Sequence, residues 1–277
     1  MKETNKHITQ LLLQSHGMDV SKYDDLFLSK TLQKRITETR YNSYDEYCSN
    51  LEKNNEEANV FIESLQISHS EFFRNSLTFS VLERVLFPSI ILQMKHSKRK
   101  EIRIWSAACA AGQEVYSLTI LLEELKNGDC QKFNYRIFAT DHSEKQVNQA
   151  QKGEYSEEAL NNLNLKRVKE WFIRNDNMYS VKPTLKENIN FSVFDLFSEQ
   201  LSSPAASIFG DFDIVVCANL LFYYKPEYRK QILKKIGNSL AKEGYIIVGE
   251  AERDILMNEN WHEVFPQSGI FKRIEHG

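Results

Sequence analysis

The stretch RIWSAACAAGQEVYSLTILLEEL, residues 103–125, decides the fold class of this chain. Ile104 and Trp105 close an apolar strand, residues 107–112 are all alanine, cysteine or glycine, and an amphipathic helix begins near Glu114. Small residues between a strand and a helix either bring the backbone close to a ligand or let the helix pack tightly on the sheet. The single glycine does not complete the pattern of a dinucleotide-binding loop, so these residues leave both interpretations open.

The composition indicates an ordinary globular protein of 277 residues with a net charge of −3. This charge gives no broad basic surface, which argues against nucleic acid as the main partner. The four cysteines are scattered without a CxxC pair, so neither a disulfide framework nor a zinc site is indicated. The polar N-terminus and the short apolar stretches, such as 214–224, favour a cytoplasmic protein without direct membrane insertion.

Strand and helix patterns alternate from residue 102 onward. We expect strands at 102–106, 135–140, 189–194, 212–217 and 244–250, and helices at 113–126, 143–151 and 226–241. This alternation predicts an α/β fold, a Rossmann-like parallel sheet with helices on both faces. Residues 1–67 show only helical patterns and are expected to form a small all-helical N-terminal domain. The second domain, 68–277, begins with a linker and first helix over 68–101.

Two local features of this second domain are also predicted. Pro88 lies inside an apolar helical pattern over 77–94, and we expect it to kink or break that helix. The final apolar segment, GIFKRI at 269–274, is expected to form an antiparallel strand at the edge of the sheet.

Three polar residues follow predicted strands, where ligands bind in open α/β sheets. Asp141 is placed to accept hydrogen bonds from two ribose hydroxyls, or simply to cap the next helix. Asn219 offers an amide, and Tyr223 lies in an aromatic cluster that also fits a packing role. No phosphate-loop lysine, nucleophile elbow or metal-ligand cluster is present in the sequence. The pattern favours chemistry that needs mainly positioning, such as methyl transfer from S-adenosylmethionine (SAM).

Four motifs, in order along the chain, resemble those of the CheR-type protein-glutamate O-methyltransferases of chemotaxis receptors. They are HSEFFRN at 69–75, WSAACAAGQEVYSL at 105–118, FATDHS at 138–143 and CANLLFYYKPE at 217–227. The stretch LQKRITETRYNSYDEYCSNL, 32–51, is similar to the helical domain of that family. The resemblance implies a SAM methyltransferase fold, SAM as methyl donor, S-adenosylhomocysteine as product and no metal.

The resemblance also implies which residues form the site. The cofactor-binding residues would be Ser70, Arg74, Ala108, Glu114, Asp141, Asp195, Leu196, Ala218 and Asn219. Arg74 and Tyr223 match residues near the reactive methyl group and are the catalytic candidates. Gln113 replaces a glutamate of the family and Ala218 an arginine, so a SAM-binding regulator with little turnover is an alternative. A methyltransferase with another acceptor is the second alternative.

The resemblance makes the cytoplasmic helical region of chemoreceptors the expected partner. Lys30 and Lys34 lie one helical turn apart, opposite the apolar stripe of Leu28, Leu32 and Ile36, so they can steer an acidic helix or form an ordinary solvated face. Receptor pentapeptides are bound, in the family, by a small β-subdomain with a glycine-rich hairpin. Residues 169–191 contain no glycine and leave only the loop RNDNM, after a helix ending at Ile173, so no pentapeptide tether is expected.

Overall fold

The computed structural model describes residues 2–66, 69–94, 101–128, 133–207 and 210–274. These residues form two compact units. The first, the helical unit, combines Met1–Ile67 with Leu221–Lys230, and the second, the sheet unit, combines Ser68–Leu220 with Gln231–Gly277. The helical unit is therefore built from two stretches that lie far apart in the sequence.

The N-terminal stretch of the helical unit forms helices with capped first turns. Its helices are α1 (Lys2–His16), α2 (Asp25–Thr39), α3 (Tyr44–Leu51) and α4 (Asn55–Leu65). The side chains of Asp24, Ser43 and Asn54 accept hydrogen bonds from the first-turn N–H groups of α2, α3 and α4 respectively. These four helices confirm the all-helical N-terminal domain that the sequence predicts.

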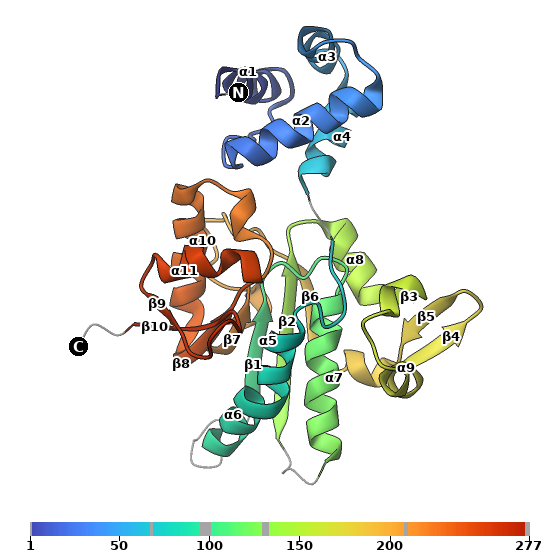
Figure 1. Cartoon of the computed structure of the whole chain (residues 1–277), viewed down its shortest axis with the longest axis vertical. Coiled ribbons are helices and arrows are strands. Elements are labelled where there is room, and N and C mark those ends of the chain that lie inside the picture. Colours follow the sequence, from blue (N-terminus) through green and yellow to red (C-terminus); the bar gives the residue numbers. More distant parts are fainter. Residues whose placement is uncertain (1, 67–68, 95–100, 129–132, 208–209, 275–277) are drawn as a thin grey trace. The chain divides into compact units, whose positions relative to one another are not determined.

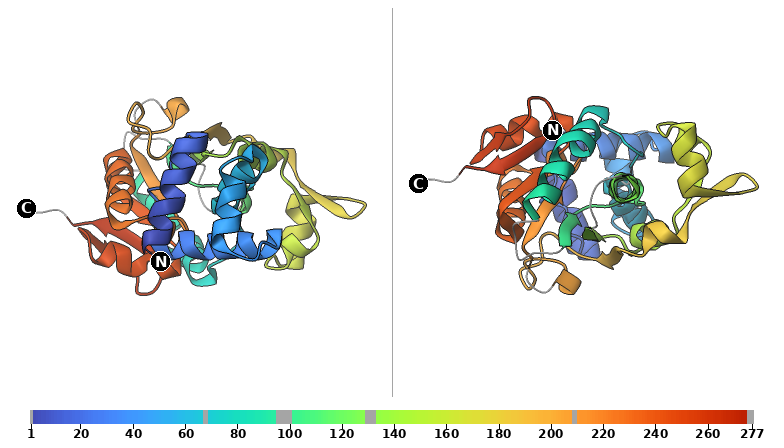
Figure 2. Two further views of the ribbon diagram at one scale, coloured as in Figure 1. Left: turned by 90° about the horizontal axis from the view of Figure 1, so that it is seen from above. Right: turned by 90° about the horizontal axis from the view of Figure 1, so that it is seen from below.

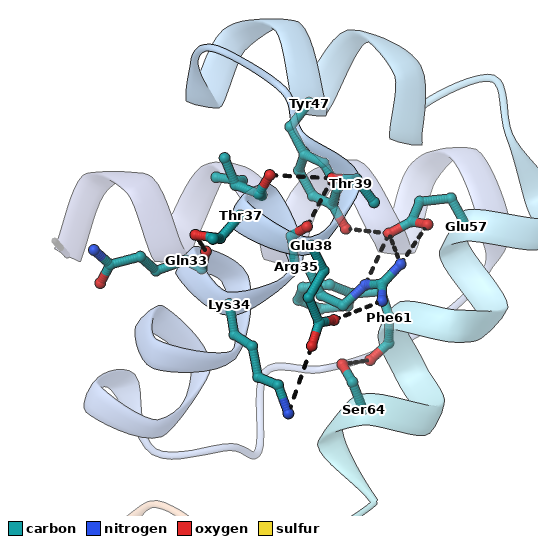
Figure 3. A network of polar contacts seen from close by, with 11 residues as sticks. Gln33, Lys34, Arg35, Thr37, Glu38, Thr39, Tyr47, Glu57, Phe61 and Ser64 are labelled. Carbon is teal, nitrogen blue, oxygen red and sulfur yellow. Dashed lines mark hydrogen bonds and ion pairs between the residues drawn. The ribbon is translucent and has the colours of Figure 1, made fainter.

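Charged side chains also tie α2 to α3 and α4 (Figure 3). The guanidinium of Arg35 donates to both oxygens of Glu57, at 2.9 and 2.7 Å from Nη2, and to Glu38 at 2.9 Å. The hydroxyl of Tyr47 donates to Glu57 at 2.8 Å. Arg35 and Glu57 are only 14% and 10% exposed, so this paired network fixes the three helices against one another.

The second stretch of the helical unit, Leu221–Lys230, packs along the start of α2. It contains the 3₁₀ turn η5 (Leu221–Tyr223) and the beginning of α10 (Pro226–Ser239). Tyr224 forms an antiparallel bridge with Tyr23, and their rings stack with centroids 5.4 Å apart. The N–H of Asp24 donates to the carbonyl of Tyr223 at 2.8 Å. These contacts attach the second stretch, Leu221–Lys230, to the residues just before α2.

The sheet unit is built on a seven-stranded sheet (Figure 1). Its strands are β1 (Glu101–Ser106), β2 (Asn134–Asp141), β6 (Ile189–Val193), β7 (Phe212–Val216), β8 (Leu240–Ile247), β9 (Trp261–Glu263) and β10 (Ile270–Arg273). Their order is β6-β2-β1-β7-β8-β10-β9, and the first five are parallel. The predicted α/β fold class is confirmed. The strand order reverses between β1 and β7, which is where such sheets bind ligands.

Two apolar layers cover the sheet. On one face, Ile104, Ile137 and Ile214 pack with the helices that precede and follow β1. These helices are α5 (Ser76–Val81), the π-helical turn η1 (Leu82–Leu86), α6 (Phe87–Met94) and α7 (Gln113–Asn127), and α8 (Glu144–Lys152) follows β2. Trp105 and Phe138 point to the opposite face, where both rings pack on Phe212. Both faces of β1 and β2 are therefore buried, as parallel strands require.

Pro88 does not end its helix. The helix runs from Ser76 to Met94, and the turn before the proline widens to a π-helical turn in which the N–H of Phe87 donates to the carbonyl of Leu82. This widening accommodates a ring that would clash with an earlier carbonyl in a regular helix. The 19-residue helix is long and apolar enough to cross a membrane, contrary to the expectation of only short apolar stretches. Its Leu82, Leu86 and Phe87 nevertheless lie in the core of the sheet unit.

A second, three-stranded antiparallel sheet has the order β3-β5-β4 (Figure 1). Its β4–β5 hairpin is the yellow ribbon in both views of Figure 2. It consists of β3 (Glu154–Ser156), β4 (Phe172–Asn175) and β5 (Met178–Val181), and α9 (Leu165–Trp171) leads into β4. The expected helix end at Ile173 is therefore wrong, and the expected loop RNDNM is reduced to a turn at residues 176–177. Ile173 lies in β4, and Asp176, at φ 52°, makes a tight hairpin turn that glycine would otherwise provide.

The C-terminal strand is antiparallel but is not at the edge. β10 pairs with β8 on one side and with β9 on the other, so the edge expected for residues 269–274 is occupied by β9. The remaining elements are α11 (Arg253–Met257) and the 3₁₀ turns η2 (Glu158–Leu160), η3 (Pro183–Lys186), η4 (Ala205–Ser207) and η6 (Glu250–Glu252).

Candidate active site

The candidate site lies at the carboxyl ends of the parallel strands. The small-residue loop follows β1, Asp141 ends β2, Asp195 follows β6, Asn219 follows β7, and Glu252 follows β8. The sheet register sets the ends of neighbouring strands side by side, with Ser106 opposite Ala139 and Val216. The sheet alone therefore gathers these five segments at one edge of the unit.

Backbone hydrogen bonds connect the loop after β1 to the ends of the neighbouring strands β2 and β7. The N–H of Ala107 donates to the carbonyl of Val216, and that of Cys109 to the carbonyl of Thr140, both at 2.8 Å. Gly112 has a φ of 92°, and a Cβ there would lie 2.9 Å from the Cβ of Ala150. The tight-packing interpretation of the small residues therefore holds at Gly112, while Ala108 is partly exposed at the edge.

Asp141 ties the β1 loop to the β2 loop. Its Oδ2 accepts the N–H of Ala110 at 3.0 Å, and its Oδ1 accepts the N–H of Ser143 at 3.0 Å. Ser143, and not Asp141, occupies the N-cap position of α8, so the capping interpretation is wrong. Each oxygen keeps acceptor capacity for a ligand hydroxyl, and the side chain is only 6% exposed.

Glu114 stands in the first turn of α7 and accepts the hydroxyl of Ser106 at 2.9 Å. The pKa of its carboxyl is raised to about 7. Burial is the main cause and Glu252 contributes, whereas the Ser106 hydrogen bond and Arg74 lower the pKa. A carboxyl group with a pKa near 7 loses its proton when a cation is placed beside it. Glu114 is therefore suited to bind an ammonium group.

Arg74 is held by the backbone on both sides. The N–H of Phe73, at φ 50°, donates to the Ser117 hydroxyl on α7 at 3.0 Å, and Asn75 caps α5. The Arg74 side chain is exposed, and one N–H donates to the carbonyl of His69 at 3.3 Å. Ser70 is partly buried in the same segment. Arg74 therefore has a fixed base and a guanidinium facing solvent.

The segment after β7 is held by Glu252, a residue after β8 to which the sequence analysis gave no role. Asn219 adopts φ 61°, and its N–H donates to Glu252 at 2.7 Å. Glu252 is 0% exposed and belongs to the stretch GEAE, 249–252. The sequence signal was an acidic residue just after a buried strand, but its partners are three backbone N–H groups that only the folded chain brings together.

The other predicted residues have simpler surroundings. Asp195 is exposed and accepts the N–H of Phe197 at 2.9 Å, and Leu196 is buried. Ala218 is partly exposed. Tyr223 belongs to the helical unit, where its ring lies 4.8 Å from that of Phe27. Lys30 and Lys34 are exposed on α2 as expected, and Nζ of Lys34 lies 3.8 Å from Glu38.

The donor set of the sheet unit fits SAM. Within the described residues, Oε1 of Gln113 is buried without a hydrogen-bond partner at the start of α7, one residue before Glu114. An orphaned acceptor beside a carboxyl group matches the cationic methionyl end, and the Asp141 carboxylate matches ribose hydroxyls. Burial raises the pKa of the thiols of Cys109 and Cys217, so neither is suited to act as a nucleophile.

Two family models match consecutive parts of the chain. The model of the CheR methyltransferase all-alpha domain matches residues 6–65, and the model of the CheR methyltransferase SAM binding domain matches residues 68–270. Curated relatives are named chemotaxis protein methyltransferase. One from Borreliella burgdorferi is 27% identical over 96% of this chain and 93% of its own length, and one from Escherichia coli is 25% identical over 89% and 83%.

Proposed function

The chain belongs to the CheR methyltransferase family, and from this membership we propose that it transfers the methyl group of SAM to glutamate carboxylates of chemoreceptors. The observation that carries the proposal is the match of the SAM binding domain across 68–270, which includes every strand end that supplies the site. The names of the relatives support chemotaxis as the process.

The methyl transfer requires that the substrate carboxylate be aligned with the methyl group, and the carboxylate needs little activation. A substrate glutamate has a pKa of about 4.3, so it is already ionised at neutral pH. One of its oxygens bonds to the methyl carbon while the bond from that carbon to the sulfonium sulfur breaks, which leaves S-adenosylhomocysteine. No metal is needed because the attacking group is already an anion. Alignment of the two reactants can contribute roughly 7–11 kcal/mol to such a step.

We assign Arg74 and Tyr223 to the reacting groups. The planar fork of the Arg74 guanidinium can orient a substrate carboxylate through parallel N–H donors. The flanking backbone at Phe73 and Asn75 supports this role, because its hydrogen bonds fix the point from which the Arg74 side chain extends. Tyr223 would act as a neutral hydrogen-bond donor beside the methyl group.

We assign the remaining site residues to the cofactor. Asp141 would accept the ribose hydroxyls, and Glu114 would bind the methionyl ammonium, with the Gln113 carbonyl as an added acceptor. Asp195 and Leu196 would flank the adenine. Ser70, Ala108, Ala218 and Asn219 would complete the pocket wall.

The partner would be the cytoplasmic helical region of a receptor, and we therefore place the protein in the cytoplasm. Lys30 and Lys34 on α2 would steer an acidic receptor helix. Glu38 lies beside Lys34 and also pairs with Arg35, so it reduces the positive charge of this face. Steering would therefore depend on a few solvent-exposed lysines and would weaken strongly as salt rises.

We further propose that recognition does not use a receptor pentapeptide tether. The β4–β5 hairpin has strands of only four residues joined by a tight turn, which leaves a short edge for an added peptide strand. Titration with a receptor C-terminal pentapeptide tests this proposal. No saturable binding is expected, whereas micromolar binding would overturn it.

Incubation with methyl-labelled SAM and chemoreceptor fragments tests the proposed function. We expect base-labile label on receptor glutamates, because methyl esters hydrolyse in alkali. SAM binding without any transfer would indicate a regulator instead. Transfer to a nucleic acid or small molecule, without receptor methylation, would indicate another acceptor.

A further inference from the structure

Glu252 draws together two strand ends at the candidate site. Its carboxylate accepts the N–H groups of Asn219 at 2.7 Å, Leu220 at 2.6 Å and Gly249 at 2.8 Å. The first two follow β7 and the third follows β8, so one wholly buried side chain joins two loops. Burying a carboxylate is costly unless it is well hydrogen-bonded, and here its partners are backbone groups of the site itself.

These hydrogen bonds support an unusual backbone conformation at Asn219. Its φ of 61° lies in the left-handed region, which costs energy for residues other than glycine. The Asn219 side chain lies directly on Gly249, because a Cβ at residue 249 would be 2.6 Å from its Nδ2 and 3.0 Å from Oε2 of Glu252. Glu252 and Gly249 together therefore fix both the backbone and the amide of Asn219.

Glu252 also acts on Glu114 through its charge. The pKa of Glu114 is raised to about 7, mainly by burial and also by Glu252, while the Ser106 hydrogen bond and Arg74 act in the opposite direction. The other titratable groups that interact with Glu114 are Cys109 and Cys217, whose own pKa values burial raises. Removal of the Glu252 charge should therefore lower the pH at which Glu114 ionises.

We propose that Glu252 is a positioning residue of the SAM site, which holds the Ala218–Leu220 turn as a pocket wall and sets a second negative charge near Glu114. The proposal rests on the assignment of Asn219 and Glu114 to the cofactor under the proposed function. Glu252 itself need not touch SAM, since the backbone N–H groups of Asn219, Leu220 and Gly249 already hold its carboxylate in place.

Calorimetric titration of the full chain with SAM between about pH 5.5 and 7.5 tests the proposal. Glu252→Gln keeps the shape but removes the charge and turns one acceptor into a donor. We expect at least about tenfold weaker binding at pH 7.5, and a lower midpoint of the affinity profile. Glu250→Gln, on the exposed neighbour in η6, is the matched control and should bind as the wild type does.

Glu252→Asp keeps the charge but shortens the reach, so it should weaken binding without moving the midpoint. If Glu252→Gln does not fold, Glu252→Asp still tests the proposal. Wild-type SAM affinity in Glu252→Asp would overturn it. Glu252→Gln with an unchanged midpoint would equally overturn it and leave only a structural role. Intact SAM binding without receptor methylation would instead contradict the proposed function and leave the role of Glu252 standing.

Discussion

Asp141 and Glu252 of the sheet unit and Lys30 and Lys34 of the helical unit carry their charges in opposite surroundings. At the sheet edge, Asp141 and Glu252 are buried, and their carboxylates accept backbone N–H groups. In the helical unit, Arg35 pairs with Glu57 inside the fold, and Lys30 and Lys34 face solvent. Buried, fixed charges act over short distances on a small ligand, whereas solvated charges act over longer distances and are screened by salt.

This difference indicates that the two units are suited to bind different kinds of ligand. A small cofactor is bound by charges whose positions are set before binding. A large helical partner is attracted by charges that stay hydrated until contact is made. The expected effects of substitutions therefore differ between the units in size, in salt dependence and in pH dependence.

The largest effect is expected on the rate of methyl transfer when Arg74, an exposed residue of the sheet unit, is replaced. Arg74→Ala should lower kcat for receptor methylation by about 10²–10³-fold while SAM affinity changes little, because the guanidinium would orient the reacting carboxylate. Arg74→Lys keeps the charge but not the fork and should restore little activity. Equal rates for wild type and Arg74→Ala, measured with labelled SAM, would make Arg74 a structural residue.

The next effect concerns stability and pH at Glu114. Its folded-state pKa of about 7 exceeds the ordinary 4.5, so between these values the folded chain binds more protons than the unfolded chain. The stability of the cofactor-free protein should therefore fall as pH rises from about 4.5 to about 7. The full penalty at higher pH is on the order of 3 kcal/mol.

Glu114→Gln removes this penalty and keeps an acceptor for Ser106. The variant should melt at higher temperature than the wild type at pH 8, and the difference should vanish near pH 4.5. It should also bind SAM less tightly, since no anion faces the ammonium. Equal melting temperatures at pH 8 would show that Glu114 is not destabilised by burial.

Asp141→Ala should weaken SAM binding at least tenfold, about 1.4 kcal/mol, through the loss of charge-assisted hydrogen bonds. It also leaves the N–H groups of Ala110 and Ser143 without their partner, so some loss of stability is expected. Calorimetry on the folded variant measures the first effect separately. Unchanged affinity would remove Asp141 from the cofactor site.

The smallest effect is expected on the solvated face of α2. Lys30→Glu/Lys34→Glu should raise the KM for receptor a few-fold at low salt and leave SAM affinity unchanged, because surface charges contribute little individually. Glu38→Gln should lower that KM by releasing Lys34. Lys53→Glu, a charge reversal at another exposed lysine of the same unit, is the control, although it changes the net charge by two units and the double variant by four. A KM that does not respond to Lys30→Glu/Lys34→Glu would leave this face without a docking role.

The central sheet was predictable because its strands are long and apolar. The strands expected at 102–106, 135–140, 189–194 and 212–217 correspond to β1, β2, β6 and β7 within a residue or so. The β3–β5 sheet was harder, because its strands have three or four residues and β4 is mostly exposed. Strands this short contain too few alternating apolar and polar residues to be distinguished from a loop.

The site was predictable where a residue follows its own strand and not where partners come from elsewhere. Asp141 and Asn219 stand at strand ends that hydrophobic patterns locate directly. The role of Glu252 depends on three N–H groups, two of them more than thirty residues away in sequence, which no local pattern reveals. The same limit hid β9, whose insertion beyond β10 is a matter of topology.

The pairing of Leu221–Lys230 with the helical unit has a consequence for synthesis of the chain. Domains commonly fold as they leave the ribosome, N-terminal parts first. Here the aromatic surface of Tyr23 and Phe27 gains its partners Tyr224 and Tyr223 only after about 200 further residues have been made. We expect the helical unit to emerge early with an open aromatic edge and to close only when most of the sheet unit has already been translated.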